Sequence, residues 1–106
     1  MVRGITIACG GFYGPQGRRI RMEIQDPGQN AKVEAFRYRT DDKGKVREMK
    51  VCNFEMESSA LAGLASILGH RAMTCCMVIA NRHAQEMNTS YKNTIDNLIS
   101  LVLERI

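Results

Sequence analysis

The stretch VCNFEMESSALAGLASILGHRAMTCCMVIANR, from Val51 to Arg82, decides the fold class predicted for this chain. Its first residues complete a strand-like run, and its middle repeats apolar residues at helical spacing, at Leu61, Leu64, Ala65 and Leu68. Gly69 follows this stripe, where helices commonly end in a left-handed residue. The run from Arg71 to Ala80 is then almost continuously apolar, which is typical of a strand buried on both faces of a sheet. A strand, a helix and a buried strand in this order indicate an α/β fold.

The residues before this stretch add a strand, a loop and a segment of ambiguous structure. Ile5–Ala8 is largely apolar and β-branched and leads to paired glycines, which predicts a strand followed by a turn. Phe12–Arg19, FYGPQGRR, has the composition of a loop, and Ile20–Ile24 fits an extended segment before the turn signal Asp26-Pro27-Gly28. Gln29–Arg39 fits either a helical stripe or, toward its end, an extended segment.

The remaining elements complete the predicted order. Thr40–Lys45 reads as a polar turn and Val46–Phe54 as a strand, and Ser58 or Ser59 is placed to cap the helix that follows. A last helix is predicted after a cap at Asn88, Thr89 or Ser90, and its apolar side is formed by Ile95, Leu98, Ile99, Val102 and Ile106. We therefore expect residues 1–106 to form a single domain with a layered αβα arrangement around a mixed sheet.

The amino-acid composition limits further the type of protein that this chain can be. Hydrophobic residues make up 44% and charged residues 25%, as in a globular chain, and the net charge of +4 is typical of an ordinary solvated surface. The four cysteines form no C-x-x-C pair, so no zinc site is expected, and three of them lie in apolar runs that suggest buried free thiols. We expect a cytoplasmic protein, because the N-terminus has no signal-peptide pattern and no stretch is long enough to span a membrane.

Three polar clusters directly follow the three predicted strands. Because ligands of open α/β sheets bind beyond the carboxyl ends of the strands, these clusters are expected to share one edge. They consist of Phe12, Gln16, Arg18 and Arg19; of Glu55 and Glu57; and of Asn81 and Arg82. Each has an ordinary structural interpretation as well: a solvated surface loop, carboxylates at a helix N-terminus, and a charged strand end.

NFEMESSALAGLASILGHRA followed by VIANR resembles the nucleoside phosphorylase family, and GGFYGPQGRR resembles the base-binding loop of its uridine phosphorylase branch. The matching segments run from about Ile5 to Arg82, so the resemblance covers most of the chain. It implies the layered αβα fold of that family, of which this chain would be the C-terminal portion.

The resemblance also implies roles for individual residues. Phe12 would pack against the nucleoside, and Gln16 and Arg18 would hydrogen-bond the uracil edge, where an amide and a donor-only cation suit its carbonyls and N3. Glu57 would accept hydrogen bonds from the ribose hydroxyls, beside Glu55 and Met56. The further base-pocket residue would be Arg82. The implied catalytic residues are thus Gln16, Arg18 and Arg82.

The implied reaction is phosphorolysis of uridine to uracil and ribose 1-phosphate. Phosphate is the nucleophile and co-substrate, so no cofactor or metal is expected. Arg18 and Gln16 would stabilise the negative charge that develops on the departing uracil. Purine enzymes of this kind usually carry an aspartate in place of Asn81, and because an amide cannot act as that general acid, uridine is preferred over purine nucleosides.

The chain has no counterpart of the family's N-terminal half, which holds phosphate. We therefore expect a fragment that is inactive alone and that associates with its missing half or with itself as a homo-oligomer. The alternatives are a purine nucleoside phosphorylase or nucleosidase relative, and a non-catalytic nucleoside-binding or assembly fragment. A nucleic-acid-binding domain is disfavoured because the basic residues are dispersed and aromatics make up only 6%.

Overall fold

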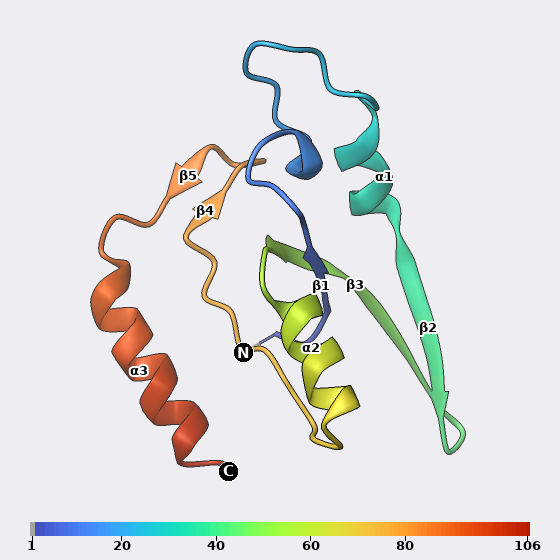
Figure 1. The fold of residues 1–106 in the computed structure, drawn as a ribbon, viewed down its shortest axis with the longest axis vertical. Coiled ribbons are helices and arrows are strands. Elements are labelled where there is room, and N and C mark those ends of the chain that lie inside the picture. Colours follow the sequence, from blue (N-terminus) through green and yellow to red (C-terminus); the bar gives the residue numbers. More distant parts are fainter. Residues whose placement is uncertain (1) are drawn as a thin grey trace. The chain divides into compact units, whose positions relative to one another are not determined.

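The computed structural model describes residues 2–106 and shows mixed α/β structure, as the sequence predicts (Figure 1). The chain divides into two compact units, one reaching to Met73 and one comprising Thr74–Ile106. No helix within the described residues is both long enough and apolar enough to cross a bilayer.

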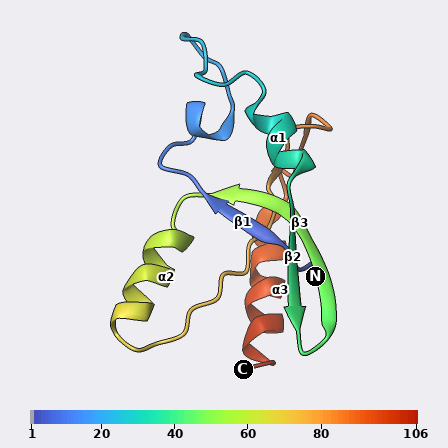
Figure 2. The same ribbon diagram turned by 90° about the vertical axis from the view of Figure 1, so that its right-hand side faces the viewer.

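The first unit is built on a three-stranded mixed sheet in the order β1-β3-β2 (Figures 1 and 2). β1 (Ile5–Ala8) pairs in parallel with the last part of the long β3 (Lys45–Glu55), whereas β2 (Arg37–Asp42) pairs with β3 in the antiparallel sense. The parallel pair is reinforced by the Thr6 hydroxyl, which donates to Asn53 Oδ1 at 2.7 Å. Strands therefore form in the two segments where β-branched and apolar residues predict them.

The segment Gln29–Arg39, for which the sequence allows a helix or an extended chain, contains first the helix and then the extended chain. Gln29–Ala35 forms α1, and the chain becomes extended at Phe36 before β2 begins. The polar turn that follows is shorter than predicted: only Lys43 and Gly44, with φ of 54° and 78°, separate the two paired strands. Two consecutive left-handed residues are what a tight hairpin between twisted strands requires.

The helix α2 (Ser58–Ile67) ends as its sequence predicts. Gly69 has a φ of +73°, its N–H donates to the Ser66 carbonyl at 3.2 Å, and the His70 N–H donates to the Ala65 carbonyl at 2.7 Å. These two bonds satisfy carbonyls that the helix leaves without partners, in the arrangement known as the Schellman motif.

The second unit contains a short hairpin and the C-terminal helix. Ala80–Asn81 (β4) pairs in antiparallel fashion with Glu86–Met87 (β5), and α3 spans Tyr91–Leu103 with Ser90 at its N-cap position. The predicted last helix is therefore confirmed.

Two predicted extended segments are wrong. Of the run from Arg71 to Ala80, only Ala80 lies in a strand, and Met73 and Val78 are 74% and 54% exposed. Among the described residues no strand pairs with 71–79, and an apolar run becomes a buried strand only where neighbouring strands supply hydrogen-bond partners. Ile20–Ile24 likewise forms bends rather than a strand, with Ile20 60% exposed.

The cysteines also differ from expectation in part. All four are free thiols, but only Cys9 is buried, whereas Cys75 is half-buried and Cys52 and Cys76 are exposed. The exposure of Cys76 has the same cause as that of Met73, because both lie in the run that does not join a sheet.

Candidate functional site

The parallel pairing of β1 and β3 brings two of the three polar clusters to one edge of the sheet. Ala8 and Glu55 are register partners at the ends of these strands, and the Cys9 N–H donates to the Glu55 carbonyl at 2.8 Å. The loop that contains residues 12–19 and the segment Glu55–Glu57 therefore start from neighbouring points (Figure 2). Parallel strands end at a common edge, so strand order alone gives this proximity.

The 12–19 loop folds into a compact turn. The 3₁₀ turn η1 (Gly14–Gln16) is closed by the Tyr13 carbonyl, which accepts from the N–H groups of Gln16 at 2.9 Å and Arg18 at 3.0 Å. Gly17 has a φ of +69° and completes the reversal. Gln16 lies in this turn and is only 2% exposed, the one buried polar side chain among the described residues.

Arg18 is bound to its own loop through two aromatic rings and one backbone carbonyl. Its Cζ lies 4.0 Å from the centre of the Phe12 ring and 4.5 Å from that of Tyr13, two rings that meet edge to face. Its Nε and Nη2 donate to the Phe12 carbonyl at 3.1 and 2.6 Å. Cation–π contacts and paired hydrogen bonds fix the plane of the group, which carries five N–H donors in all. The structure thus brings Phe12 and Arg18 together, and their contact with a nucleoside stays a prediction.

Glu55 caps the N-terminus of α2. Its carboxylate accepts hydrogen bonds from the Ser58 hydroxyl, from the Ser58 N–H at 2.7 Å and from the Glu57 N–H at 2.8 Å. These bonds, the Ser58 hydroxyl first among them, hold the pKa of Glu55 below its ordinary value of 4.5. Glu55 therefore has the role that the sequence assigned to Ser58 or Ser59, and its contact with a substrate stays a prediction.

Met56 and Glu57 lie on the surface of the same corner. Glu57 occupies the N-cap position of α2, and its Oε2 accepts from the Met56 N–H at 3.3 Å. The Met56 side chain is 43% exposed. An exposed carboxylate at a helix N-terminus is an acceptor-only group, which suits a ligand that carries hydroxyl donors.

The third cluster lies in the second unit. Asn81 ends β4, and its Oδ1 accepts from the Ala84 N–H at 3.2 Å, which stabilises the turn between β4 and β5. Arg82 lies in that turn. Arg82 belongs to a different unit from Gln16, Arg18 and Glu57, so its convergence with them stays a prediction.

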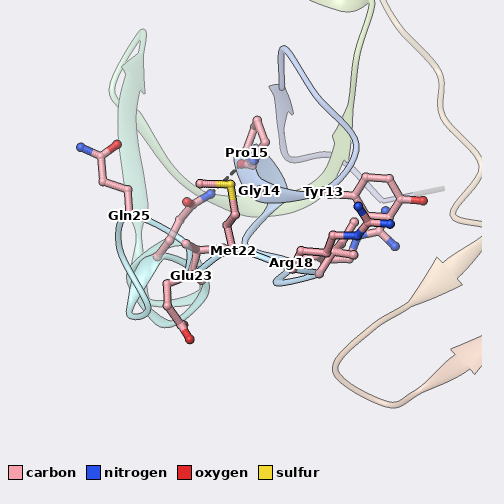
Figure 3. Close-up of a pocket in the computed structure, with 11 residues that line it drawn as sticks. Tyr13, Gly14, Pro15, Arg18, Met22, Glu23 and Gln25 are labelled. Atoms are coloured by element: carbon pink, nitrogen blue, oxygen red, sulfur yellow. Dashed lines mark hydrogen bonds between the residues drawn. The ribbon is translucent and has the colours of Figure 1, made fainter.

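An open hollow of about 680 Å³ lies beside the turn (Figure 3). It is lined by Tyr13, Pro15, Arg18, Gln29 and the segment 20–25, so it shares Arg18 with the candidate site. Sequence reasoning missed Tyr13 and Gln29. Tyr13 was signalled by its position beside Phe12, whereas nothing in the local sequence around Gln29 relates it to the turn.

Comparison with known proteins gives two matches. The sequence profile of the phosphorylase superfamily matches residues 1–104. A uridine phosphorylase from Thermococcus kodakarensis is 42% identical over 84 residues, which are 78% of this chain and 26% of that protein. The chain thus spans about a quarter of the length of this relative. No solved structure gives a significant match.

Proposed function

Because the chain belongs to the phosphorylase superfamily, we propose that it supplies the base- and ribose-binding part of a uridine phosphorylase. The observation that carries this proposal is the placement of the Phe12–Arg18 pair and Glu57 at adjoining strand ends. The similarity to the Thermococcus kodakarensis uridine phosphorylase supports uridine as the substrate.

The 12–19 loop is suited to a base that leaves as an anion. In phosphorolysis the N-glycosidic bond breaks as phosphate oxygen bonds to the ribose anomeric carbon, and the bonding electrons pass to uracil. A cation and an amide at the uracil edge stabilise this charge more strongly in the transition state than in the ground state. The fixed guanidinium plane of Arg18 favours this role, because little reorientation accompanies the reaction.

The surface corner at Glu57 is suited to the sugar. A carboxylate accepts hydrogen bonds from two vicinal hydroxyls, and Met56 offers an apolar contact beside it. In this proposal Arg82 completes the base pocket from the second unit. Phosphate is a co-substrate held by residues outside this chain, and no cofactor takes part.

Asn81 favours a pyrimidine over a purine. Its amide has no acidic proton for a purine ring nitrogen, and its Oδ1 already accepts from the Ala84 N–H. A substrate panel tests this point: uridine, inosine and methylthioadenosine offered with phosphate to the complete enzyme, meaning this chain together with the phosphate-binding half. Faster turnover of uridine supports the proposal, and preferential cleavage of inosine or methylthioadenosine contradicts it.

A non-catalytic nucleoside-binding fragment is the second candidate. The chain spans only 26% of its relative, which favours binding without turnover when it is isolated. Uracil binding and uridine phosphorolysis measured on one sample separate the two. Binding without turnover by the isolated chain, with turnover restored by the phosphate-binding half, supports the enzyme. Binding without turnover in both samples supports the fragment.

A further inference from the structure

We propose that Gln29 is a positioning residue for the turn that buries Gln16 and presents Arg18 to the base, an inference that rests on the proposed function. Gln29 is the first residue of α1 and lies outside the FYGPQGRR, NFEMES and VIANR motifs. Its action is indirect: it holds the backbone on which the recognising side chains stand.

The carbonyl directly before Gln16 is bound by Gln29. Gln29 Nε2 donates to the Pro15 carbonyl at 2.6 Å across a separation of 14 residues. The same carbonyl accepts a weaker hydrogen bond from Cys9 Sγ at 3.6 Å, from the end of β1. Figure 3 shows Pro15 at the turn and Arg18 beside Tyr13. The Pro15 carbonyl is thus bound both by the residue that follows β1 and by the first residue of α1.

The carbonyl of Gly17, the residue after Gln16, is contacted by Asn30, the second residue of α1. Asn30 Nδ2 lies 3.5 Å from the Gly17 carbonyl oxygen, and a Cβ added to Gly17 would overlap the Asn30 side chain. Gly17 also has a φ of +69°, which disfavours any other residue. Gln29 and Asn30 therefore contact the backbone on both sides of the buried Gln16.

The start of α1 is itself well anchored. The Gln29 N–H donates to the Asp26 carbonyl at 3.1 Å, and Asp26 Oδ1 accepts from the Gly28 N–H at 2.9 Å. Lys32 bonds the other Asp26 carboxylate oxygen at 2.6 Å, and this bond is the main cause that lowers the pKa of Asp26. A turn that is already ordered before binding loses less conformational freedom when the base binds. The affinity of the site for the base is therefore higher.

Two substitutions of matched helix propensity separate the hydrogen bond from side-chain size. Gln29→Met keeps the length of the side chain and removes the donor, whereas Gln29→Lys keeps a donor of similar reach. The control is Glu34→Met, an exposed position on the same helix. All are made in the complete enzyme and compared with the wild type by amide hydrogen exchange and steady-state kinetics.

The two readouts answer different questions. In Gln29→Met, exchange at the amides of Gln16, Gly17 and Arg18 should accelerate about fivefold, the effect of one net hydrogen bond. The KM for uridine should rise about fivefold, with kcat and the KM for phosphate within about twofold of wild type. In Gln29→Lys both the exchange rates and the KM for uridine should return most of the way to the wild-type values. Glu34→Met should change neither quantity.

Unchanged exchange in Gln29→Met would show that Gln29 does not hold the turn, and faster exchange with an unchanged KM for uridine would refute its role in base recognition. Equal increases in both KM values would indicate a general structural defect and also overturn the inference. A wild-type enzyme that does not cleave uridine refutes the proposed function instead, and the exchange experiment then still decides whether Gln29 holds the turn.

Discussion

Arg18 makes cation–π contacts with the Phe12 and Tyr13 rings and donates two hydrogen bonds to the Phe12 carbonyl, which together orient its guanidinium. We predict that Arg18→Ala lowers kcat/KM for uridine in the complete enzyme by about 10²- to 10³-fold, as expected for loss of a preorganised donor to a developing anion. Arg18→Lys should recover little, because an ammonium lacks the planar fork. Steady-state phosphorolysis measures both effects.

The control for Arg18 is Arg39→Ala. Arg39 forms an exposed ion pair with Glu48 on the β2–β3 hairpin, and its side chain is 76% exposed. Such pairs contribute little, so kcat/KM should stay within about twofold. An equal loss in Arg39→Ala and Arg18→Ala would mean that Arg18 acts only through general charge or stability.

Glu55 makes the stability of α2 dependent on pH. Folding lowers the pKa of Glu55, so its contribution to stability is fully present above the ordinary value of 4.5 and is lost as the pH falls through the lower folded value. We predict that Glu55→Gln is less stable than wild type at neutral pH and that the difference shrinks as the pH falls below about 4. Urea unfolding followed by circular dichroism at several pH values measures this.

Ser58→Ala is the companion variant, because the Ser58 hydroxyl is the largest cause of the lowered pKa. It should lose part of the same acid-sensitive stability. Free energies of unfolding that run parallel for wild type and Glu55→Gln across the whole pH range would show that Glu55 does not stabilise α2 through its charge.

At the scale of the element, Gly63 within α2 and Gly69 just after its C-terminus are expected to respond oppositely to substitution by alanine. Gly69 has a φ of +73° and open space around it, so Gly69→Ala should destabilise by about 1 kcal/mol through backbone strain alone. Gly63 lies in the helix interior, also in open space, so Gly63→Ala should stabilise by roughly 0.5–1 kcal/mol. Denaturant unfolding of both variants tests the pair, and changes of the same sign would contradict it.

At the scale of the whole molecule, the chain has little interior. Among the described residues only Cys9 and Gln16 are buried, and on α2 Leu64 and Ile67 are 62% and 82% exposed. β1 also lies at an edge of its sheet. Exposed apolar surface and an unpaired strand edge both favour association.

We therefore predict that the isolated chain self-associates as its concentration rises, and that the phosphate-binding half reduces this self-association by forming a mixed complex. Leu64→Glu should weaken self-association, because it places a charge on the exposed apolar side of α2, whereas the nearby Ser66→Glu should change it less. Light scattering over a concentration series provides the measurement. A monomer at every concentration would refute the prediction.

Short-range features were predictable from the sequence because each depends on a few neighbouring residues. The left-handed Gly69, the turn at Asp26-Pro27-Gly28 and the helix over Tyr91–Leu103 follow from conformational preference and apolar spacing.

Only the tertiary structure decided the features that need a distant partner. The apolar run after Gly69 has the composition of a buried strand, yet a strand forms only where another strand accepts its hydrogen bonds, and composition does not supply that neighbour. Gln29 reaches Pro15 because the chain folds back across 14 residues. Local preference is encoded residue by residue, whereas these contacts depend on where the rest of the chain lies.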